Sequence, residues 1–351
     1  MRRREFSVAL SALALASGRD AFALPAMKLD FPRDHGAHPG LRTEWWYITG
    51  QARSANREFG FQVTFFRSRI EGTQGMTSRF AAKQIVFAHA ALTDVEGREL
   101  LHDQRIARAG FDVAETQEGD ARVRLRDWSL DRSAGGYAAR VSSHDFALDL
   151  RCATTQPLLL QGKDGLSRKG PQTSQASYYY SEPQLAVAGN IVLRGQRLSI
   201  EGKAWLDHEW SDELLHSDAV GWDWIGMNLD DGSALTAFRL RKQDGSTIWD
   251  GGSFRANGGN TYVFSPGEAV FSPQRKWTSP MSGATYPVEW IVRTPADFYT
   301  VKALVDNQEL DSRASTGSIY WEGLSELFDS NGKRVGRGYL EMTGYSQRLR
   351  M

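Results

Sequence analysis

The chain has 351 residues, of which 41% are apolar and 24% charged, and its formal net charge is 0. These values are ordinary for a globular protein, and the balance of charges argues against nucleic acid or an anionic membrane surface as the partner. The length is large for one domain and sufficient for two. With 34 glycines and 11 tryptophans, the composition is typical of many short strands joined by tight turns.

Residues 1–23 have the features of an export signal. Arginines 2–4 precede an apolar run at 7–17 that is too short to span a bilayer, and 21–23 reads A-F-A, a signal-cleavage pattern. Residues 3–6 fit the twin-arginine pattern R-R-x-F, although a general secretory signal with extra arginines is the alternative. We expect removal of 1–23 and a periplasmic location. Cleavage removes four arginines and two acidic residues, so the net charge falls from 0 to −2.

After this segment, apolar residues recur almost entirely with period two, which predicts strands. The single cysteine, Cys152, cannot form an internal disulfide, and its place on an alternating apolar face indicates a buried thiol. We expect a long loop at 163–177. The expected strands are at 44–51, 59–65, 84–92, 122–126, 136–142, 145–154, 184–194, 197–210, 222–229, 234–241, 247–254, 268–272, 286–293, 299–305, 318–328 and 334–345.

Asp-Gly, Glu-Gly and Asn-Gly pairs between these runs supply the backbone freedom that tight hairpins need. We find no convincing amphipathic helix of three turns. Because closure removes exposed strand edges, we predict an all-β fold of two tandem antiparallel barrels, at 24–215 and 216–351. The interior of such a small barrel is filled by side chains or holds one small ligand.

Aromatic residues gather in three segments of the chain. Such side chains can line an apolar ligand cavity and offer an indole N–H or a phenol O–H to fix the ligand's orientation. Alternatively, they form barrel core or a domain interface. The residues are Trp45, Trp46, Tyr47, Trp205, Trp210, Trp222 and Trp224.

Polar residues occur in the same segments. Asp-His pairs beside aromatic rings suit proton transfer, because a carboxylate fixes the imidazole tautomer and burial raises a carboxyl pKa. The alternative is that they clamp loops at a barrel rim. The catalytic candidates are Asp34, His35, Asp207, His208 and Asp223, and the candidates for contact with a ligand or for clamping are His38, Arg42, Glu44 and Glu209.

A metal site is weakly indicated. His35-x-x-His38 with His208 and an acid could supply three ligands, but H-x-x-H on a Pro/Gly loop is much less specific than H-E-x-x-H on a helix. No phosphate-binding glycine motif and no G-x-S-x-G elbow occurs. We therefore predict neither a metal nor a cofactor.

Four segments carry a family resemblance: FPRDHGAHPGLRTEWWYITG (31–50), GKAWLDHEWS (202–211), GWDWIGMNL (221–229) and YWEGLSELFDSNGKRVGRGYLEMTGY (320–345). In this order they resemble the two-domain lipocalin-like proteins grouped as carotenoid 1,2-hydratase-like, or AttH-like. The resemblance extends over nearly the whole chain after the signal. It implies two lipocalin-like barrels in tandem.

The resemblance also implies a range of functions. Hydratases of this family add water across the terminal C=C of an acyclic carotenoid, with an acidic residue protonating the alkene; fungal phytoalexin hydratases and pericyclic cyclases are related. Exported bacterial members, often encoded beside ABC-transporter permeases, have no assigned reaction, and some are described only as secreted hydrolases. This sequence resembles the exported branch more.

One departure from the hydratase pattern bears on chemistry. The hydratases follow the Asp-His-x-Trp segment with a Tyr-Asp pair about 25 residues later, whereas the corresponding stretch here, ALTAFRL at 234–240, contains neither residue. His208 and Trp210 match the pattern. Asp207, Asp223 or Asp34 would have to replace the proton donor.

From these observations we expect an exported protein that holds an apolar, lipid- or isoprenoid-like ligand near the domain interface, with Arg42, His35 and His208 orienting its polar end. A membrane permease is a further partner to consider. The alternatives are an acid-catalysed hydratase or isomerase acting through Asp207 and His208, an unassigned secreted hydrolase, and a scaffold of an export complex without a ligand.

Overall fold

The computed structural model describes residues 24–133, 135–213 and 215–349, so the expected export signal lies outside the described residues. Within these ranges the only helical pieces are two 3-10 turns, η1 (Arg33–His35) and η2 (Glu71–Thr73), and no helix there is long and apolar enough to cross a membrane. The strands are β1 (Thr43–Ser54), β2 (Arg57–Arg69), β3 (Gln84–Asp94), β4 (Glu99–Arg108), β5 (Ala114–Thr116), β6 (Arg122–Leu125), β7 (Trp128–Ser133), β8 (Gly136–Ser142), β9 (Phe146–Ala153), β10 (Leu159–Leu160), β11 (Leu166–Arg168), β12 (Ala176–Leu193), β13 (Gln196–Ser211), β14 (Gly221–Leu229), β15 (Ala234–Arg241), β16 (Thr247–Arg255), β17 (Thr261–Val263), β18 (Val270–Pro273), β19 (Lys276–Thr278), β20 (Thr285–Pro287), β21 (Glu289–Arg293), β22 (Phe298–Ala303), β23 (Glu309–Asp311), β24 (Ile319–Phe328) and β25 (Arg334–Met342).

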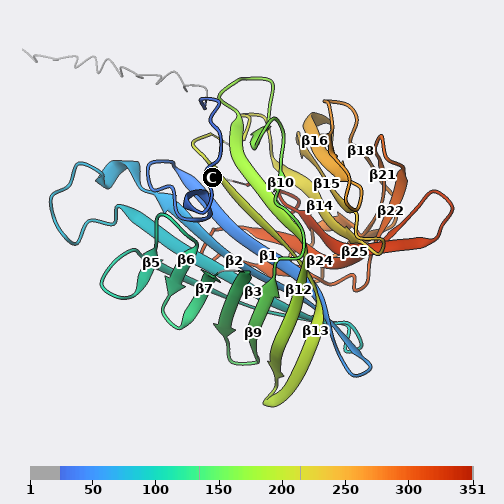
Figure 1. Ribbon diagram of the computed structural model, residues 1–351, viewed down its shortest axis with the longest axis horizontal. Coiled ribbons are helices and arrows are strands. Elements are labelled where there is room, and N and C mark those ends of the chain that lie inside the picture. Colours follow the sequence, from blue (N-terminus) through green and yellow to red (C-terminus); the bar gives the residue numbers. More distant parts are fainter. Residues whose placement is uncertain (1–23, 134, 214, 350–351) are drawn as a thin grey trace, which may run out of the picture.

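The first sheet is antiparallel and nearly closed into a barrel. Its strand order is β4-β3-β2-β1-β13-β12-β9-β8-β7-β6-β5, with β10 and β11 added to β12, and its two ends approach each other where β3 and β4 contact β5 and β6 (Figure 1). Alternate residues point into the barrel, as the period-two pattern requires. The core includes Trp46, Phe61, Trp128 and Trp210, none of which is exposed.

The second sheet has the order β17-β16-β15-β14-β25-β24-β22-β21-β18, with β23 paired to β24. Its core is built around Trp290 and Trp321, and β19 and β20 form a separate hairpin. Residues 212–220 connect β13 of the first sheet to β14 of the second. The predicted all-β class, with two tandem antiparallel lipocalin-like units, is confirmed.

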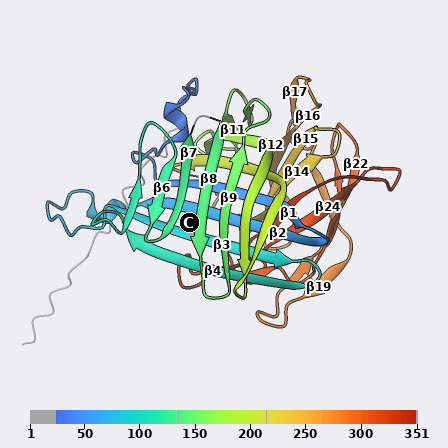
Figure 2. The ribbon, with the colours of Figure 1, turned by 60° about the horizontal axis from the view of Figure 1, so that its bottom comes forward.

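The two sheets pack against each other along β1, β2 and β13 on one side and β14, β24 and β25 on the other. The long strands of the first sheet and the strands of the second lie side by side in both views (Figures 1 and 2). Polar contacts join them across the seam: the Gln184 amide donates to the Leu229 carbonyl at 2.8 Å, and Arg337 pairs with Glu58 at 3.0 Å. One face of the first sheet and one face of the second sheet therefore lie on opposite sides of the space between the two sheets.

Two local expectations were wrong, and several strands were not expected. The loop expected at 163–177 contains β11, and β12 begins at Ala176 rather than near 184, so three consecutive tyrosines belong to a strand. Strand β4 was not expected, because its residues are half-buried and largely polar and therefore lack a clear alternation.

Candidate functional site

A cavity of about 450 Å³ lies between the two sheets, within the range of small-molecule sites. Strand alternation decides which aromatics reach it: Trp45 and Tyr47 of β1 line the cavity, whereas Trp46 between them is buried in the first barrel. The second sheet contributes Trp222 and Trp224 from β14. The apolar wall is completed by Phe66, Ile70, Ile85, Phe87, Ile106, Leu215, Phe238 and Leu240.

The same alternation divides the segment 205–210. Asp207 and Glu209 line the cavity, whereas His208 and Trp210 are fully buried on the opposite face, inside the first barrel. The structure therefore separates Asp207 from His208, so an acid–histidine pair formed by these neighbours is not available in the cavity. Trp205 lies on the cavity side and is buried behind Asp207.

Asp207 accepts three hydrogen bonds. The Tyr179 hydroxyl donates at 2.7 Å, the Ser181 hydroxyl at 2.5 Å and the Trp205 indole at 2.7 Å. Burial raises the pKa of Asp207 to about 7, although these donors act in the opposite direction. The Trp224 indole in turn donates to the Tyr179 hydroxyl at 3.3 Å, which links the network to the second sheet.

A pair of glutamates faces the same cavity from the second sheet. Glu322 of β24 lies directly opposite Glu341 of β25 in the antiparallel register, and both line the cavity. Directly opposed like charges destabilise a sheet. Burial and the charge of Glu341 raise the pKa of Glu322 well above its usual value, and burial raises the pKa of Glu341 to about 7. At neutral pH the pair therefore retains a proton.

Three buried polar atoms on this wall make no hydrogen bond of good geometry among the described residues: the Tyr47 hydroxyl, Gln62 Oε1 and Glu322 Oε1. The Tyr47 hydroxyl is nevertheless near enough to the Glu322 carboxyl to act on its pKa. The three atoms come from β1, β2 and β24, and all three residues line the cavity. A buried polar atom without a partner costs about 1–3 kcal/mol. The arrangement therefore offers hydrogen bonds to a polar group inside an otherwise apolar space.

Among the described residues, the basic side chains that line the cavity do not form ion pairs with most of its acidic side chains. Lys169 pairs with Glu209 at 3.0 Å and lies over the rings of Tyr179 and Phe238. Arg42 also lines the cavity, and its backbone N–H donates to Asp212 at 2.9 Å. Asp207, Glu322 and Glu341 have no ion pair within 24–133, 135–213 and 215–349. Burial without an ion pair therefore disfavours the charged form of all three carboxyls and raises the pKa of each.

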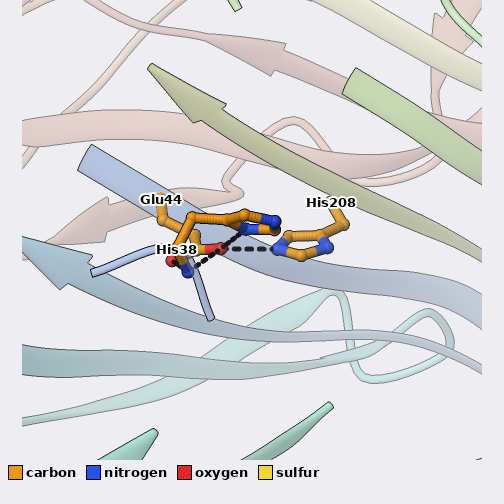
Figure 3. A group of neighbouring side chains, drawn as sticks. All are labelled: His38, Glu44 and His208. Carbon is orange, nitrogen blue, oxygen red and sulfur yellow. Dashed lines mark hydrogen bonds and ion pairs between the residues drawn. The ribbon is translucent and has the colours of Figure 1, made fainter. Parts of the chain in front are cut away.

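His38, Glu44 and His208 form a separate cluster inside the first barrel, drawn in Figure 3. Glu44 Oε1 lies 2.7 Å from His38 Nδ1 and 2.9 Å from His208 Nε2, and the Arg67 guanidinium donates to Oε2 at 2.7 Å. Although burial alone would raise the pKa of Glu44, hydrogen bonds from both histidines and the charge of Arg67 hold it well below its usual range. Burial lowers the pKa of His208 to about 4, so its ring is neutral.

This cluster continues through the interior of the barrel. The Tyr180 hydroxyl lies 3.3 Å from His208 Nδ1 and 2.7 Å from His35 Nδ1, and Asp34 Oδ1 lies 3.2 Å from His38 Nε2. The three atoms of His38, Glu44 and His208 are close enough to hold a metal ion. However, the buried guanidinium of Arg67 already compensates the Glu44 charge, so the geometry fits a hydrogen-bonded clamp on the entry segment.

Asp223 belongs to neither group. Its side chain lies on the core face of the second sheet, where Arg239 Nε donates to it at 2.7 Å and the Tyr345 hydroxyl at 2.9 Å. The structure thus distributes the catalytic candidates over three places: Asp207 lines the cavity, Asp34, His35 and His208 lie in the first barrel, and Asp223 lies in the second.

Sequence reasoning missed several cavity residues: Gln62, Lys169, Tyr179, Tyr320, Glu322 and Glu341. The sequence did contain a pattern that indicates the orientation of the two glutamates. Glu322 alternates with the buried Trp321, and Glu341 with the buried Leu340 and Met342, so each acid faces away from the core of its sheet. Only their cross-strand register, which the sequence does not give, places them opposite each other.

Comparisons with solved structures agree with this architecture. A protein of Nitrosomonas europaea, provisionally identified as AttH, is 46% identical, with a TM-score of 0.86 and coverage of 92% of this chain and 99% of that chain. Kievitone hydratase from Nectria haematococca is 13% identical, with a TM-score of 0.71 and coverage of 91% and 94%. CghA is 14% identical, with a TM-score of 0.54 and coverage of 87% and 89%. The last two share the fold.

A comparison with curated proteins finds no match. The AttH-like family model matches residues 23–345, which is most of the chain and includes all four segments that carry the resemblance in the sequence. Together with the 46% identity over nearly the whole Nitrosomonas europaea protein, this match confirms the resemblance. The chain belongs to the AttH-like family.

Proposed function

We propose that the chain binds a small, mostly apolar molecule in the cavity between the sheets and catalyses addition of water to, or migration of, a C=C bond. The observation that carries this proposal is the opposed Glu322–Glu341 pair in an aromatic wall. A site that only held an apolar ligand would gain nothing from two facing buried carboxyls, because their burial is costly. A carboxyl can act as a general acid at neutral pH only when its pKa is raised in this way.

Glu322 is the proposed proton donor. Burial and the charge of Glu341 raise the pKa of Glu322 well above its usual range, although the Tyr47 and Tyr320 hydroxyls act in the opposite direction. Asp207 is less suited, because Tyr179, Ser181 and Trp205 already donate to its oxygens. An acceptor saturated by three donors is disposed to remain the acceptor.

The reaction balances without a cofactor. Glu322 transfers its proton to one alkene carbon, which leaves a cation on the other carbon. In hydration, water adds to the cation while Glu341 accepts a proton from that water; in migration, Glu341 instead removes a proton from a neighbouring carbon. Proton transfer between the two glutamates restores the starting state. The side chains of Trp45, Tyr47 and Trp224 line the same space, and an aromatic ring whose face meets the cation would stabilise it.

The substrate class follows from the lining. A cavity of about 450 Å³ suits a molecule of drug-like size. The apolar wall selects a hydrocarbon body, whereas Tyr47, Gln62 and Glu322 offer hydrogen bonds to one neutral polar group, such as a hydroxyl or a carbonyl. An alkene alcohol of isoprenoid type has both features.

The second candidate function is binding without catalysis. It is favoured by the size of the apolar wall, which extends from Phe66 and Phe87 of the first sheet to Phe238 and Leu240 of the second. In this version, the protein carries an apolar molecule in the periplasm, after export directed by residues 1–23, and delivers it to or receives it from a membrane permease.

Farnesol and geraniol serve as probes for both functions. Incubation in H2(18)O followed by mass spectrometry detects hydration as incorporation of 18O, and incubation in D2O detects bond migration as incorporation of deuterium. We expect turnover by the native protein and a loss of at least 100-fold in Glu322→Gln and in Glu341→Gln, in the range of general acid–base contributions. Glu201→Gln, an exposed change on β13, is the matched control.

Binding is measured in parallel through the fluorescence of the cavity tryptophans. If farnesol binds but neither isotope is incorporated by the native protein, the carrier function replaces catalysis. Turnover that persists unchanged in both glutamine variants would refute the assigned acid and base. If no probe binds, both functions fail for this substrate class.

A further inference from the structure

A cluster of exposed apolar side chains lies beside the cavity mouth. Phe80 is 68% exposed, Met76 51%, Phe111 43% and Ile106 42%. Phe80 is the most exposed large apolar side chain among the described residues. Met76 and Phe80 lie in the loop between β2 and β3, and Phe111 follows β4. The rings of Phe80 and Phe111 stack with their centroids 5.5 Å apart. We call these four residues the apolar tip.

The apolar tip is continuous with the cavity. Ile106 both lines the cavity and is 42% exposed. Ile106 lies opposite Phe87 in the strand register, and Arg108 lies opposite Ile85, so these residues share one face of the sheet with the cavity wall. Ile106 is therefore followed on the same face by Arg108, whose guanidinium contacts the Phe111 ring and the Phe80 carbonyl, so the cavity wall leads to the stacked rings along this face.

Basic side chains surround the tip. The Arg108 guanidinium lies 3.9 Å from the centre of the Phe111 ring and donates to the Phe80 carbonyl at 2.7 Å, and Arg79 lies over both rings at 5.4–5.5 Å. Arg79, Lys83 and Arg108 make no ion pair within the part of the chain that the structure describes. The two stretches that carry the tip, 69–83 and 106–112, contain four basic residues and two acids, Glu71 and Asp112, and Glu71 pairs with Arg69 at 2.6 Å. Positive charge is therefore in excess in these stretches.

The loop that carries Met76 and Phe80 projects from one end of the molecule, on the side away from the second sheet, in both views (light blue in Figures 1 and 2). Exposed aromatic and apolar residues flanked by arginines match the interfacial region of a bilayer, where rings enter below the headgroups and guanidinium groups contact phosphates. The net charge of the whole chain argued against an anionic surface, but this local arrangement is complementary to one.

We propose that the apolar tip docks on the surface of an anionic lipid bilayer and places the cavity mouth at the membrane, so that an apolar ligand exchanges with the lipid phase. Binding to the bilayer requires neither hydration or migration of a C=C bond nor a ligand in the cavity. A protein that does not bind vesicles can therefore still catalyse the reaction, and the two proposals can be tested separately.

Co-sedimentation with sucrose-loaded vesicles tests the proposal. We expect the full chain after residue 23 to bind vesicles of equal phosphatidylcholine and phosphatidylglycerol at least tenfold more strongly than vesicles of phosphatidylcholine alone, with weaker binding at 300 mM than at 20 mM NaCl. Phe80→Ser should reduce the partition coefficient about tenfold, since a buried phenylalanine is worth at least that factor. Arg79→Gln should reduce only the preference for the anionic lipid.

Phe298→Ser is the matched control, because Phe298 is 56% exposed but belongs to β22 of the second sheet. It should bind vesicles like the native protein. Absence of vesicle binding by the native protein, or equal losses in Phe80→Ser and Phe298→Ser, would overturn the proposal. Light scattering without vesicles provides a further check: self-association that Phe80→Ser abolishes would show that a second copy covers the tip, and would also overturn it.

Discussion

Replacing Glu341 by glutamine should stabilise the protein above pH 7. Glutamine has nearly the shape of a protonated glutamate but cannot ionise. In the native protein Glu341 lies opposite Glu322 in a mostly apolar cavity, and its charged form is disfavoured by burial and by Asp207 and Glu209. The variant removes this unfavourable ionisation from the folded state.

The magnitude follows from the pKa of Glu341, which is raised from 4.5 to about 7. Between these two pH values the unfolded chain has lost the proton and the folded chain still holds it. The folded state thus binds more protons, and the free energy of unfolding falls as pH rises through this window. The full difference is at most about 3 kcal/mol, since solvent in the cavity reduces it. Below pH 4.5 the contribution is fully retained.

The assay is thermal unfolding of the native protein and of Glu341→Gln at pH 5 and at pH 8. At pH 5 the two melting temperatures should nearly coincide. At pH 8 the variant should melt about 5 °C higher, given about 2 °C per kcal/mol for a chain of this size. Because the two proteins are compared at the same pH, titration of groups that do not interact with Glu341 cancels. Glu322 is the exception: loss of the Glu341 charge lowers its pKa, which adds to the stabilisation at high pH.

Glu201→Gln on the exposed part of β13 should follow the native protein at both pH values. If Glu341→Gln also follows it, the cavity solvates Glu341 well enough for an ordinary pKa. The reasoning that assigns acid–base chemistry to the Glu322–Glu341 pair would then be refuted, even if the cavity binds a ligand.

The other predictions concern neighbouring positions. His208→Ala should lower the free energy of unfolding by about 2–4 kcal/mol in urea, because it removes a donor to Glu44 and leaves a void, yet should leave the fluorescence-detected Kd for farnesol unchanged. Tyr47→Phe should weaken binding of farnesol about fivefold and leave binding of the hydrocarbon farnesene unchanged. Asp207→Asn should cost about 1–3 kcal/mol of stability in urea and should retain more 18O incorporation than Glu322→Gln.

The fold was predictable because the relevant signals are local. Period-two alternation and glycine turns determine strands and hairpins, and the four segments identify the family. Some strands that the sequence did not indicate lack alternation, such as β4, or follow a polar stretch, such as the beginning of β12 at Ala176, whereas β7 alternates and was not expected either.

The site was predictable only in part. Trp45, Tyr47, Asp207, Trp222 and Trp224 were expected near a ligand, and the structure places them around the cavity. The polar residues of the entry segment were grouped with them because they are close in sequence. Two pieces of information were missing: the strand alternation that places His208 in the barrel interior, and the 3-10 turn η1 that buries His35 there.

The segments 31–50 and 202–211 therefore contribute side chains both to the interior of the first barrel and to the cavity between the sheets. On one face of β13, His208 joins Glu44 and closes a hydrogen-bonded core; on the other, Asp207 lines the cavity. Because adjacent residues share a strand, tight packing of the clamp fixes the position of the cavity wall. The Glu322–Glu341 pair lies on β24 and β25 of the second sheet, outside this clamp, so its opposition is set by the register of those two strands.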